Sequence, residues 1–181
     1  MQRLHSNVIS TSDSFRENRA HNLKLAEQLH QRLHDARYKR PQRAFDLLAE
    51  RNKLTVRARL DLLLDPGTPF LELSPLAACE AYDGTAPQAV IVTGIGVING
   101  REVVVTAGDS TIKGGSWYPL TIKKLIRAMD IAIENRLPMV HLIDSGGAYL
   151  PLQDDIYSMG GAVYYNQCRM SAMGIQQIGL V

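Results

Sequence analysis

The sequence is poor in the residues that define several protein classes. Its 181 residues include only two cysteines, Cys79 and Cys168, with no Cys-x-x-Cys pair, which argues against a disulfide framework or a zinc site. The formal net charge is only +2, so charge gives no case for nucleic-acid binding. We therefore expect a reduced, cytoplasmic protein that binds neither metal nor nucleic acid.

Long apolar runs are also missing. No stretch reaches the roughly 18 apolar residues that a membrane span needs, and residues 1–6 lack the apolar region of a signal peptide. These absences predict a protein without membrane insertion or export. The 45% hydrophobic and 21% charged residues that are present are typical of an ordinary globular domain.

The first 50 residues are predicted to form a helical extension. Between Ser12 and Tyr38, apolar residues recur at helical spacing on an otherwise polar segment. Its histidines and the basic residues after them resemble a metal or phosphate patch, but a solvated helix face is the favoured interpretation. Pro41 can begin a second helix, and residues 55–64 predict a short capped helix.

A β-hairpin over residues 89–107 is the clearest local signal. Two apolar runs flank Asn99-Gly100, a dipeptide that suits a type I′ turn because both residues take positive φ. Gly94 and Gly96 lie inside the first strand and not before a helix. We therefore predict a β-bulge there and no dinucleotide-binding fingerprint.

The pattern after the hairpin predicts a βαβ unit. A glycine-bearing loop, 108–116, leads to a helix from about Pro119 to Leu137 and then to a buried strand, 139–143. Strand, helix and strand in this order favour a parallel sheet. A further helix over 161–173 and a last parallel strand over 175–181 are also predicted.

The turn after the strand 139–143 is the predicted chemical centre. In open α/β sheets ligands lie beyond the carboxyl ends of the strands, and paired glycines let the backbone approach a ligand closely. Gly146-Gly147 stands at such a position, where N–H groups can hold a developing oxyanion. A tight structural turn without function is the alternative.

Several spaced motifs together resemble one known family. Asp109–Ser116, a helix and then Asp144–Ala148 resemble the carboxyltransferase (β) subunits of biotin-dependent acyl-CoA carboxylases, in the crotonase and ClpP superfamily. Residues similar to the 3-methylcrotonyl-CoA branch continue along most of the chain. They include 4–6, 15–18, 52–54, 57–59, 63–65, 69–75, 113–119, 148–153, 165–166 and 170–172.

The resemblance implies an α/β, crotonase/ClpP-like fold in two parts. Residues 1–50 would be the helical N-terminal extension, and residues 51–181 an incomplete N-terminal carboxyltransferase domain. Family members continue after Val181 into another glycine-rich loop and a second crotonase-like domain. We therefore expect a truncated chain that has no turnover on its own.

The resemblance also implies a reaction, the transfer of a carboxyl group from carboxybiotin to an acyl-CoA, with 3-methylcrotonyl-CoA favoured. Biotin would be carried on a partner, the biotin carboxylase or biotin carrier subunit, and the chain would join a homo-oligomer. Backbone dipoles, and not a side-chain nucleophile, would hold the enolates of this chemistry. A role for Ser145 as a hydrolase nucleophile is therefore not expected.

Site residues follow from the same resemblance. The N–H groups of Gly146, Gly147 and Ala148 are candidates for contact with an enolate or thioester oxygen. The loop before the helix N-terminus is a candidate for binding CoA phosphate or pantetheine, and comprises Lys113, Gly114, Gly115 and Ser116.

Other side chains receive weaker interpretations. Lys123, Lys124 and Arg127 are expected to be exposed and solvated, although they have the charge to bind phosphates. His141 is expected to be a packing histidine, and Trp117 either lines the acyl pocket or packs.

Three alternatives stay open at this stage. In the first, the chain is a non-catalytic fragment that binds only acyl-CoA or a partner subunit. In the second, it is a subunit of a geranyl-CoA or propionyl-CoA carboxylase. A stand-alone crotonase-like hydratase or thioesterase would need a placed acid or base, for which Asp130 and Glu134 are poor candidates. The absence of a four-cysteine motif argues against the zinc-ribbon acetyl-CoA subunits.

Overall fold

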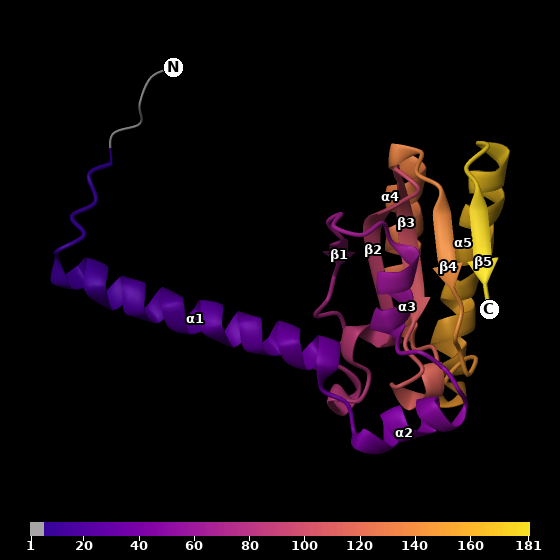
Figure 1. Ribbon diagram of the computed structural model, residues 1–181, viewed down its shortest axis with the longest axis horizontal. Helices are drawn as coiled ribbons and strands as arrows, with labels where there is room; N and C mark the ends of the chain where they lie inside the picture. The colour runs from indigo at the N-terminus through magenta and orange to yellow at the C-terminus, as the bar shows by residue number, and fades with distance from the viewer. Residues whose placement is uncertain (1–5) are drawn as a thin grey trace.

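The computed structural model describes residues 6–181. Residues 1–5, which contain Leu4 and His5 of the N-terminal resemblance, lie outside the described part. Along the chain (Figure 1) the helices and strands are α1 (Asp13–Tyr38), α2 (Gln42–Glu50), α3 (Val56–Leu63), β1 (Leu71–Leu73), β2 (Ile91–Ile98), β3 (Arg101–Gly108), α4 (Pro119–Asn135), β4 (Met139–Leu142), α5 (Gln153–Ala172) and β5 (Gln177–Leu180).

The five strands form one mixed sheet in the order β1-β2-β3-β4-β5. The first three strands pair antiparallel, whereas β3, β4 and β5 run parallel. Asn99 and Gly100 have φ angles of 51° and 73°, which confirms the predicted hairpin turn. The βαβ unit is also confirmed, since α4 joins the parallel strands β3 and β4.

The predicted bulge in β2 is wrong. The register between β2 and β3 runs without interruption from Ile91 opposite Gly108 to Ile98 opposite Arg101. The two glycines of β2 instead make room for side chains above the sheet. A Cβ at Gly94 would lie 2.2 Å from Cζ of Phe70, a separation at which atoms overlap.

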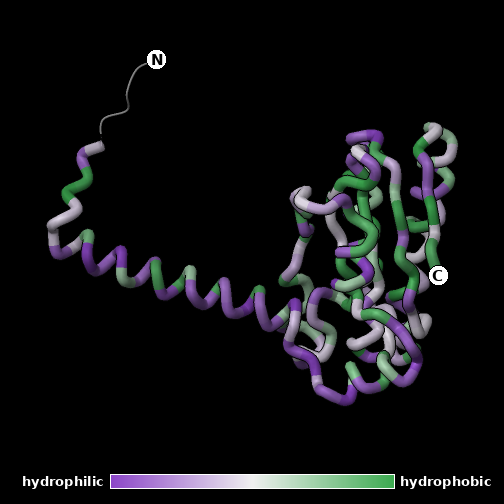
Figure 2. The backbone as a smooth tube through the Cα atoms, viewed as in Figure 1, coloured by the Kyte–Doolittle hydropathy of each residue, from purple (hydrophilic) through white to green (hydrophobic). Residues whose placement is uncertain are grey.

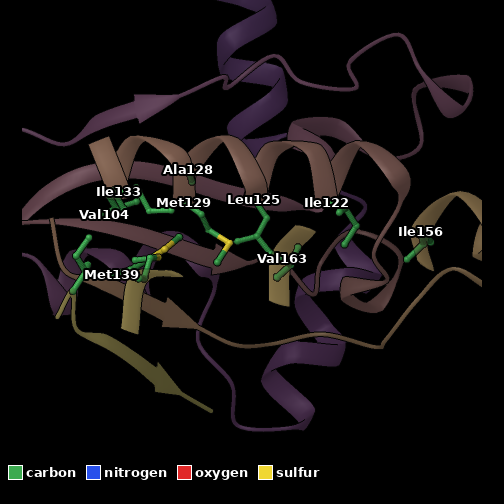
Figure 3. Close-up of a cluster of buried hydrophobic side chains, with 12 residues drawn as sticks. Val104, Ile122, Leu125, Ala128, Met129, Ile133, Met139, Ile156 and Val163 are labelled. Carbon is green, nitrogen blue, oxygen red and sulfur yellow. The ribbon is translucent and has the colours of Figure 1, made fainter. Parts of the chain in front are cut away.

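Helices cover both faces of the sheet. On one face α4 and α5 enclose the larger apolar cluster (Figure 3), in which Met129, Met139 and Val104 are fully buried. On the other face α3 packs against β2 and β3 through Val56 and Leu60. Burial on both faces explains why the central strands are almost continuously apolar.

The last helix begins earlier than predicted. α5 runs from Gln153 to Ala172 and contains Gly160 and Gly161, whereas the sequence pattern predicted a start at residue 161. Each interior glycine costs a helix roughly 1 kcal/mol. Burial of Ile156 on the N-terminal side of the glycines offsets this cost, because apolar packing outweighs intrinsic propensity.

Helix α1 projects away from the rest of the molecule (Figure 1). Ser12 begins it, as predicted, and accepts a hydrogen bond from the Phe15 N–H at 3.2 Å. Most of its apolar residues are not buried. Leu23 and Leu29 are about half exposed, and Ala36 is the only buried residue of this helix. Figure 2 accordingly shows polar and apolar positions mixed along its length.

The C-terminal end of α1 is anchored by ion pairs. Arg37 and Arg57 both contact the Glu72 carboxylate, at 3.0 and 2.7 Å. Arg40 and Asp109, both 4% exposed, pair at 3.1 Å. Asp109 opens the loop after β3, so this anchor connects the extension to the predicted site.

Among residues 6–181, no helix is long and apolar enough to cross a membrane.

Candidate functional site

The two predicted glycine loops lie side by side at the carboxyl ends of β3 and β4. The Trp117 N–H donates to the Gly147 carbonyl at 2.8 Å, and the Tyr149 N–H donates to the Trp117 carbonyl at 2.9 Å. This pairing is a short parallel bridge between Trp117 and Ala148. The residues predicted for enolate contact and those predicted for CoA contact are therefore adjacent.

Close backbone approach holds the two loops together. A Cβ at Gly115 would lie 2.5 Å from the Asp144 carbonyl oxygen, and a Cβ at Gly146 would lie 2.8 Å from the Gly114 carbonyl oxygen. Real side chains essentially never show such contacts, so only glycine allows this separation. The glycines therefore have a packing role in addition to any contact with a ligand.

The second loop presents two N–H groups that have no acceptor in the described part of the chain. The Gly147 N–H donates to the Ser145 hydroxyl at 3.1 Å, and that hydroxyl donates to the Gly115 carbonyl at 3.0 Å. For the N–H groups of Gly146 and Ala148, residues 6–181 supply no acceptor. Two backbone donors of one loop that converge on the same oxygen can stabilise negative charge on it.

The first loop has a different geometry. Lys113 and Gly114 are exposed, Gly115 is buried, and the Ser116 hydroxyl donates to the Lys113 carbonyl at 2.9 Å. The loop ends three residues before Pro119, where α4 begins. The positive end of a helix favours a nearby anion, and the Lys113 side chain adds charge at the same place.

Asp144 connects this site to the segment that precedes α3. Its carboxylate accepts hydrogen bonds from the Lys53 ammonium at 2.8 Å and the Ser110 hydroxyl at 2.6 Å, with Arg59 4.0 Å away. Burial acts to raise the pKa of Asp144, but these hydrogen bonds and the two cations leave it below its usual value. Asp144 is therefore an ionised, paired carboxylate and a poor general base.

A row of three tyrosine rings lies next to both loops, with Tyr118 and Tyr149 stacked and Tyr82 tilted against Tyr118. The rings of Tyr82, Tyr118 and Tyr149 follow one another with centroids 4.8 and 4.6 Å apart. The Tyr82 hydroxyl also accepts a hydrogen bond from the Leu120 N–H at the start of α4, and burial raises the pKa of Tyr118. Sequence analysis missed this row, although Tyr118 and Tyr149 each come soon after a glycine pair.

The expectation that Lys124 is solvated is wrong. Lys123 and Arg127 are exposed, but Lys124 is buried and donates to the Gln88 and Ile91 carbonyls at 2.9 and 2.7 Å. Burial lowers the pKa of this amine to about 8. Lys124 therefore ties α4 to the segment before β2 and does not reach a phosphate at the loops.

His141 and Trp117 both line a pocket behind the second loop. The pocket has a volume of about 300 Å³. The His141 Nδ1 lies 2.8 Å from the Thr106 hydroxyl, and its Nε2 is buried with no hydrogen-bond partner in the described chain. Burial lowers the pKa of His141, so its ring is neutral near pH 7.

Within residues 6–181 there is no cluster of three or more histidine, cysteine or acidic residues that could hold a metal ion.

Two curated proteins illustrate what this chain is similar to in sequence. The chain is 47% identical over 161 residues to the biotin-dependent 3-methylcrotonyl-coenzyme A carboxylase β1 subunit of Mycobacterium tuberculosis, covering 87% of this chain and 30% of that protein. It is 45% identical to a probable mitochondrial methylcrotonoyl-CoA carboxylase β chain of Drosophila melanogaster, covering 98% of this chain and 32% of that one. The chain thus spans about a third of these relatives' length.

The fold has a solved counterpart as well. The crystal structure of the β subunit of P. aeruginosa geranyl-CoA carboxylase superposes with a TM-score of 0.77 at 38% identity, over 98% of this chain and 34% of that one. This supports the predicted crotonase-like α/β fold. The carboxyl transferase domain family matches residues 48–181. The chain therefore belongs to the carboxyl transferase domain family, among the β subunits of biotin-dependent acyl-CoA carboxylases.

Proposed function

We propose that the paired glycine loops bind an acyl-CoA and hold its thioester oxygen while the acyl group accepts a carboxyl group from carboxybiotin. The observation that carries the proposal is the pair of N–H groups of Gly146 and Ala148, which have no acceptor within residues 6–181. Both residues lie in the loop that follows the parallel strand β4, which ends at Leu142, and ligands of such sheets bind beyond the carboxyl ends of the strands.

The proposed role of the chain is electrostatic. The biotin that has released its carboxyl group would accept a proton from the acyl group. The negative charge that this leaves on the thioester oxygen would be stabilised by the two N–H donors. No side chain at the loops is suited to act as a nucleophile or base. Ser145 is engaged in two hydrogen bonds, and Asp144 is paired with Lys53. Carboxybiotin on a partner subunit would supply the carboxyl group.

The finer parts of the proposal concern substrate and partners. The similarity to 3-methylcrotonyl-CoA carboxylase subunits favours 3-methylcrotonyl-CoA, and the Lys113–Ser116 loop at the start of α4 is the proposed contact for pantetheine or a CoA phosphate. The proposed partners are a biotin-carrying subunit and further carboxyltransferase chains.

By themselves, these 181 residues are proposed to bind the acyl-CoA thioester and to polarise its carbonyl group. The relatives are about three times as long, since this chain covers 30% and 32% of them. We expect carboxylation only when polypeptide corresponding to the rest of such a relative is also present. Biotin-dependent carboxylation by the 181 residues alone would contradict this part.

The test is a calorimetric titration of the chain with 3-methylcrotonyl-CoA and with free CoA. Ala148→Pro removes one proposed N–H donor, and Ala148→Gly is its matched control. The bridge to Trp117 uses the Gly147 carbonyl and the Tyr149 N–H, so neither variant removes a donor or an acceptor of that bridge. We expect the proline variant to lose the preference for the thioester over free CoA by about tenfold.

Two further measurements distinguish a loss of binding from a loss of folding. Circular dichroism of each variant checks that the fold survives, and the infrared carbonyl band of the bound thioester should shift to lower frequency in the wild type. Equal thioester binding by the two variants, or a folded wild type that binds no acyl-CoA, would refute the proposed function.

A further inference from the structure

Arg40 joins the N-terminal extension to the first glycine loop. It stands between α1 and α2 (Figure 1), and its side chain is buried. Its Nη2 donates to the Ala36 carbonyl at 2.8 Å and to the Asp109 carboxylate at 3.1 Å. Its Nε donates to the Thr111 hydroxyl at 3.2 Å. A guanidinium presents its donors in one rigid plane, so this single side chain fixes the end of α1 against the residues that open the loop.

Asp109 is the residue whose position Arg40 controls. Its side chain is buried, and Arg40 is its one ion-pair partner among residues 6–181. The other carboxylate oxygen accepts hydrogen bonds from the Thr111 N–H, at 3.1 Å, and from the Thr111 hydroxyl. A buried carboxylate without a cationic partner is costly, so loss of the guanidinium would drive Asp109 toward solvent.

Hydrogen bonds continue from Asp109 along the backbone of the first loop. The Ile112 N–H donates to the Asp109 carbonyl at 3.1 Å, and the Gly115 N–H donates to the Ile112 carbonyl at 2.8 Å. The Gly115 carbonyl accepts the Ser145 hydroxyl at 3.0 Å, and that hydroxyl accepts the Gly147 N–H at 3.1 Å. The chain of contacts thus ends in the second loop, on the residue between the two proposed donors.

A side-chain contact joins the same two loops. The Ser110 hydroxyl, next to Asp109 in the chain, donates to the Asp144 carboxylate at 2.6 Å. Asp144 directly precedes Ser145 in the second loop. Backbone donors stabilise a developing charge only when they are held within about 0.5 Å of the productive geometry. A displaced Ser110 would move Asp144 and misalign the donors that follow it.

We propose that Arg40 is a positioning residue of the acyl-CoA site. By fixing Asp109 and Ser110, it holds the second loop in the conformation in which the two N–H donors reach the thioester oxygen. The inference rests on the proposed function, because it needs Gly146 and Ala148 as those donors. It also gives the N-terminal extension a role in ligand recognition, although Arg40 acts through other residues and does not itself contact the ligand.

The experiment compares dissociation constants for 3-methylcrotonyl-CoA and free CoA, measured by calorimetric titration of the 181-residue chain. Arg40→Ala removes the contacts to α1 and to the loop, and Arg40→Lys is the conservative variant that can still pair with Asp109. Arg37→Ala is the matched control. It breaks an ion pair at the same end of α1, with Glu72 at 3.0 Å, and removes none of the contacts of Arg40.

Arg40→Ala should reduce the preference for the thioester over free CoA by about fivefold, as is typical of coupling through packed and hydrogen-bonded side chains. Arg40→Lys should stay within about twofold of the wild type, because its ammonium still pairs with the carboxylate, and the control should keep the wild-type ratio. A partly unfolded sample weakens both ligands by the same factor, so this ratio is the informative measurement. The infrared carbonyl band of the bound thioester should also shift less in Arg40→Ala than in the wild type.

Ser110→Ala keeps the role testable if Arg40→Ala does not fold. This variant removes only the hydroxyl that contacts Asp144. We expect about a threefold loss in the same ratio, and an unchanged ratio in folded Ser110→Ala would then overturn the positioning role.

The outcomes separate the two proposals. If Arg40→Ala is folded by circular dichroism and keeps the wild-type ratio and carbonyl band, the positioning role is wrong and the proposed function stands. An equal loss of the ratio in Arg37→Ala would also overturn the role, since any loosening of α1 would then suffice. If the wild type does not bind the thioester better than free CoA, the proposed function itself is refuted.

Discussion

The two glycine loops of the site use their glycines in different ways. In the first loop Gly115 combines a φ of +75° with the tightest contact to Asp144, while Gly114 has a φ of +63° and open space where a Cβ would stand. In the second loop Gly146 has the close contact and no positive φ. Gly147 has a φ of +89°, and a Cβ there would meet no described residue within 4 Å other than its chain neighbours. In the first loop Gly115 thus provides both the close contact and the positive φ. In the second loop Gly146 provides the close contact and Gly147 the positive φ.

This difference indicates a division of roles. The Gly115 N–H is used internally, by the Ile112 carbonyl at 2.8 Å, so the first loop supports its neighbour. The second loop leaves the N–H groups of Gly146 and Ala148 without acceptors among the described residues. The buried Gly115 gives the first loop rigidity, and the exposed second loop offers the N–H donors that are proposed to hold the thioester oxygen.

Gly115→Ala should give the largest effect. The new Cβ would lie 2.5 Å from the Asp144 carbonyl oxygen and 3.0 Å from the Ser145 Cα, both backbone atoms that cannot rotate away. With the strain of a positive φ, we expect a loss of about 3 kcal/mol or more in unfolding free energy. Urea denaturation measures it. Gly114→Ala is the control, and equal losses for the two would contradict the supporting role of Gly115.

Gly146→Ala should rank second. Its Cβ would meet the Gly114 carbonyl oxygen at 2.8 Å, but without a positive φ, so we expect a loss of about 2 kcal/mol. Because the loops must separate, acyl-CoA affinity should fall as well. A variant that is as stable as the wild type and binds as well would show that the contact between loops is not needed.

Asp144→Asn should have an intermediate effect that depends on pH. The folded-state pKa of Asp144 lies below its unfolded value of about 3.8, so ionised Asp144 stabilises the fold above that value and the contribution is lost as the pH falls below it. We expect about 1 to 2 kcal/mol of destabilisation at pH 7. The difference between variant and wild type should shrink at pH 3, and a difference that is constant with pH would argue against the ion pair with Lys53.

Gly147→Ala should give the smallest effect. Apart from Gly147 and its two chain neighbours, residues 6–181 have no atom within 4 Å of the new Cβ, so only the left-handed backbone resists the substitution, at a cost of about 1 kcal/mol. The Gly147 N–H would still donate to Ser145, and acyl-CoA binding should change little. A loss of binding similar to that of Gly146→Ala would mean that Gly147 itself meets the ligand.

Much of the fold was predictable from local pattern. The Ser12 cap, the Asn99-Gly100 turn and the strand at β4 depend on neighbouring residues alone, and each is present in the structure. The glycine loops were predicted as a site because turns after parallel strands gather at one edge of a sheet. Their contact across Gly114 and Gly146 follows from that arrangement.

Other features depended on partners distant in the chain. Lys124 has the sequence context of a surface lysine, yet the carbonyls of Gln88 and Ile91 receive its ammonium inside the molecule. The sequence pattern predicted a bulge at Gly94, but in the structure this glycine makes room for the ring of Phe70. The start of α5 depended on the apolar cluster that buries Ile156.

The sequence by itself determined the order of helices and strands, the family and the position of the two glycine loops, because periodicity, caps and turns are short-range properties. Only the tertiary structure decided which N–H groups stay without a partner, which lysine is buried and where the pocket of His141 and Trp117 lies. These depend on which atoms of distant segments come within a few ångströms. Packing of the whole chain sets those distances.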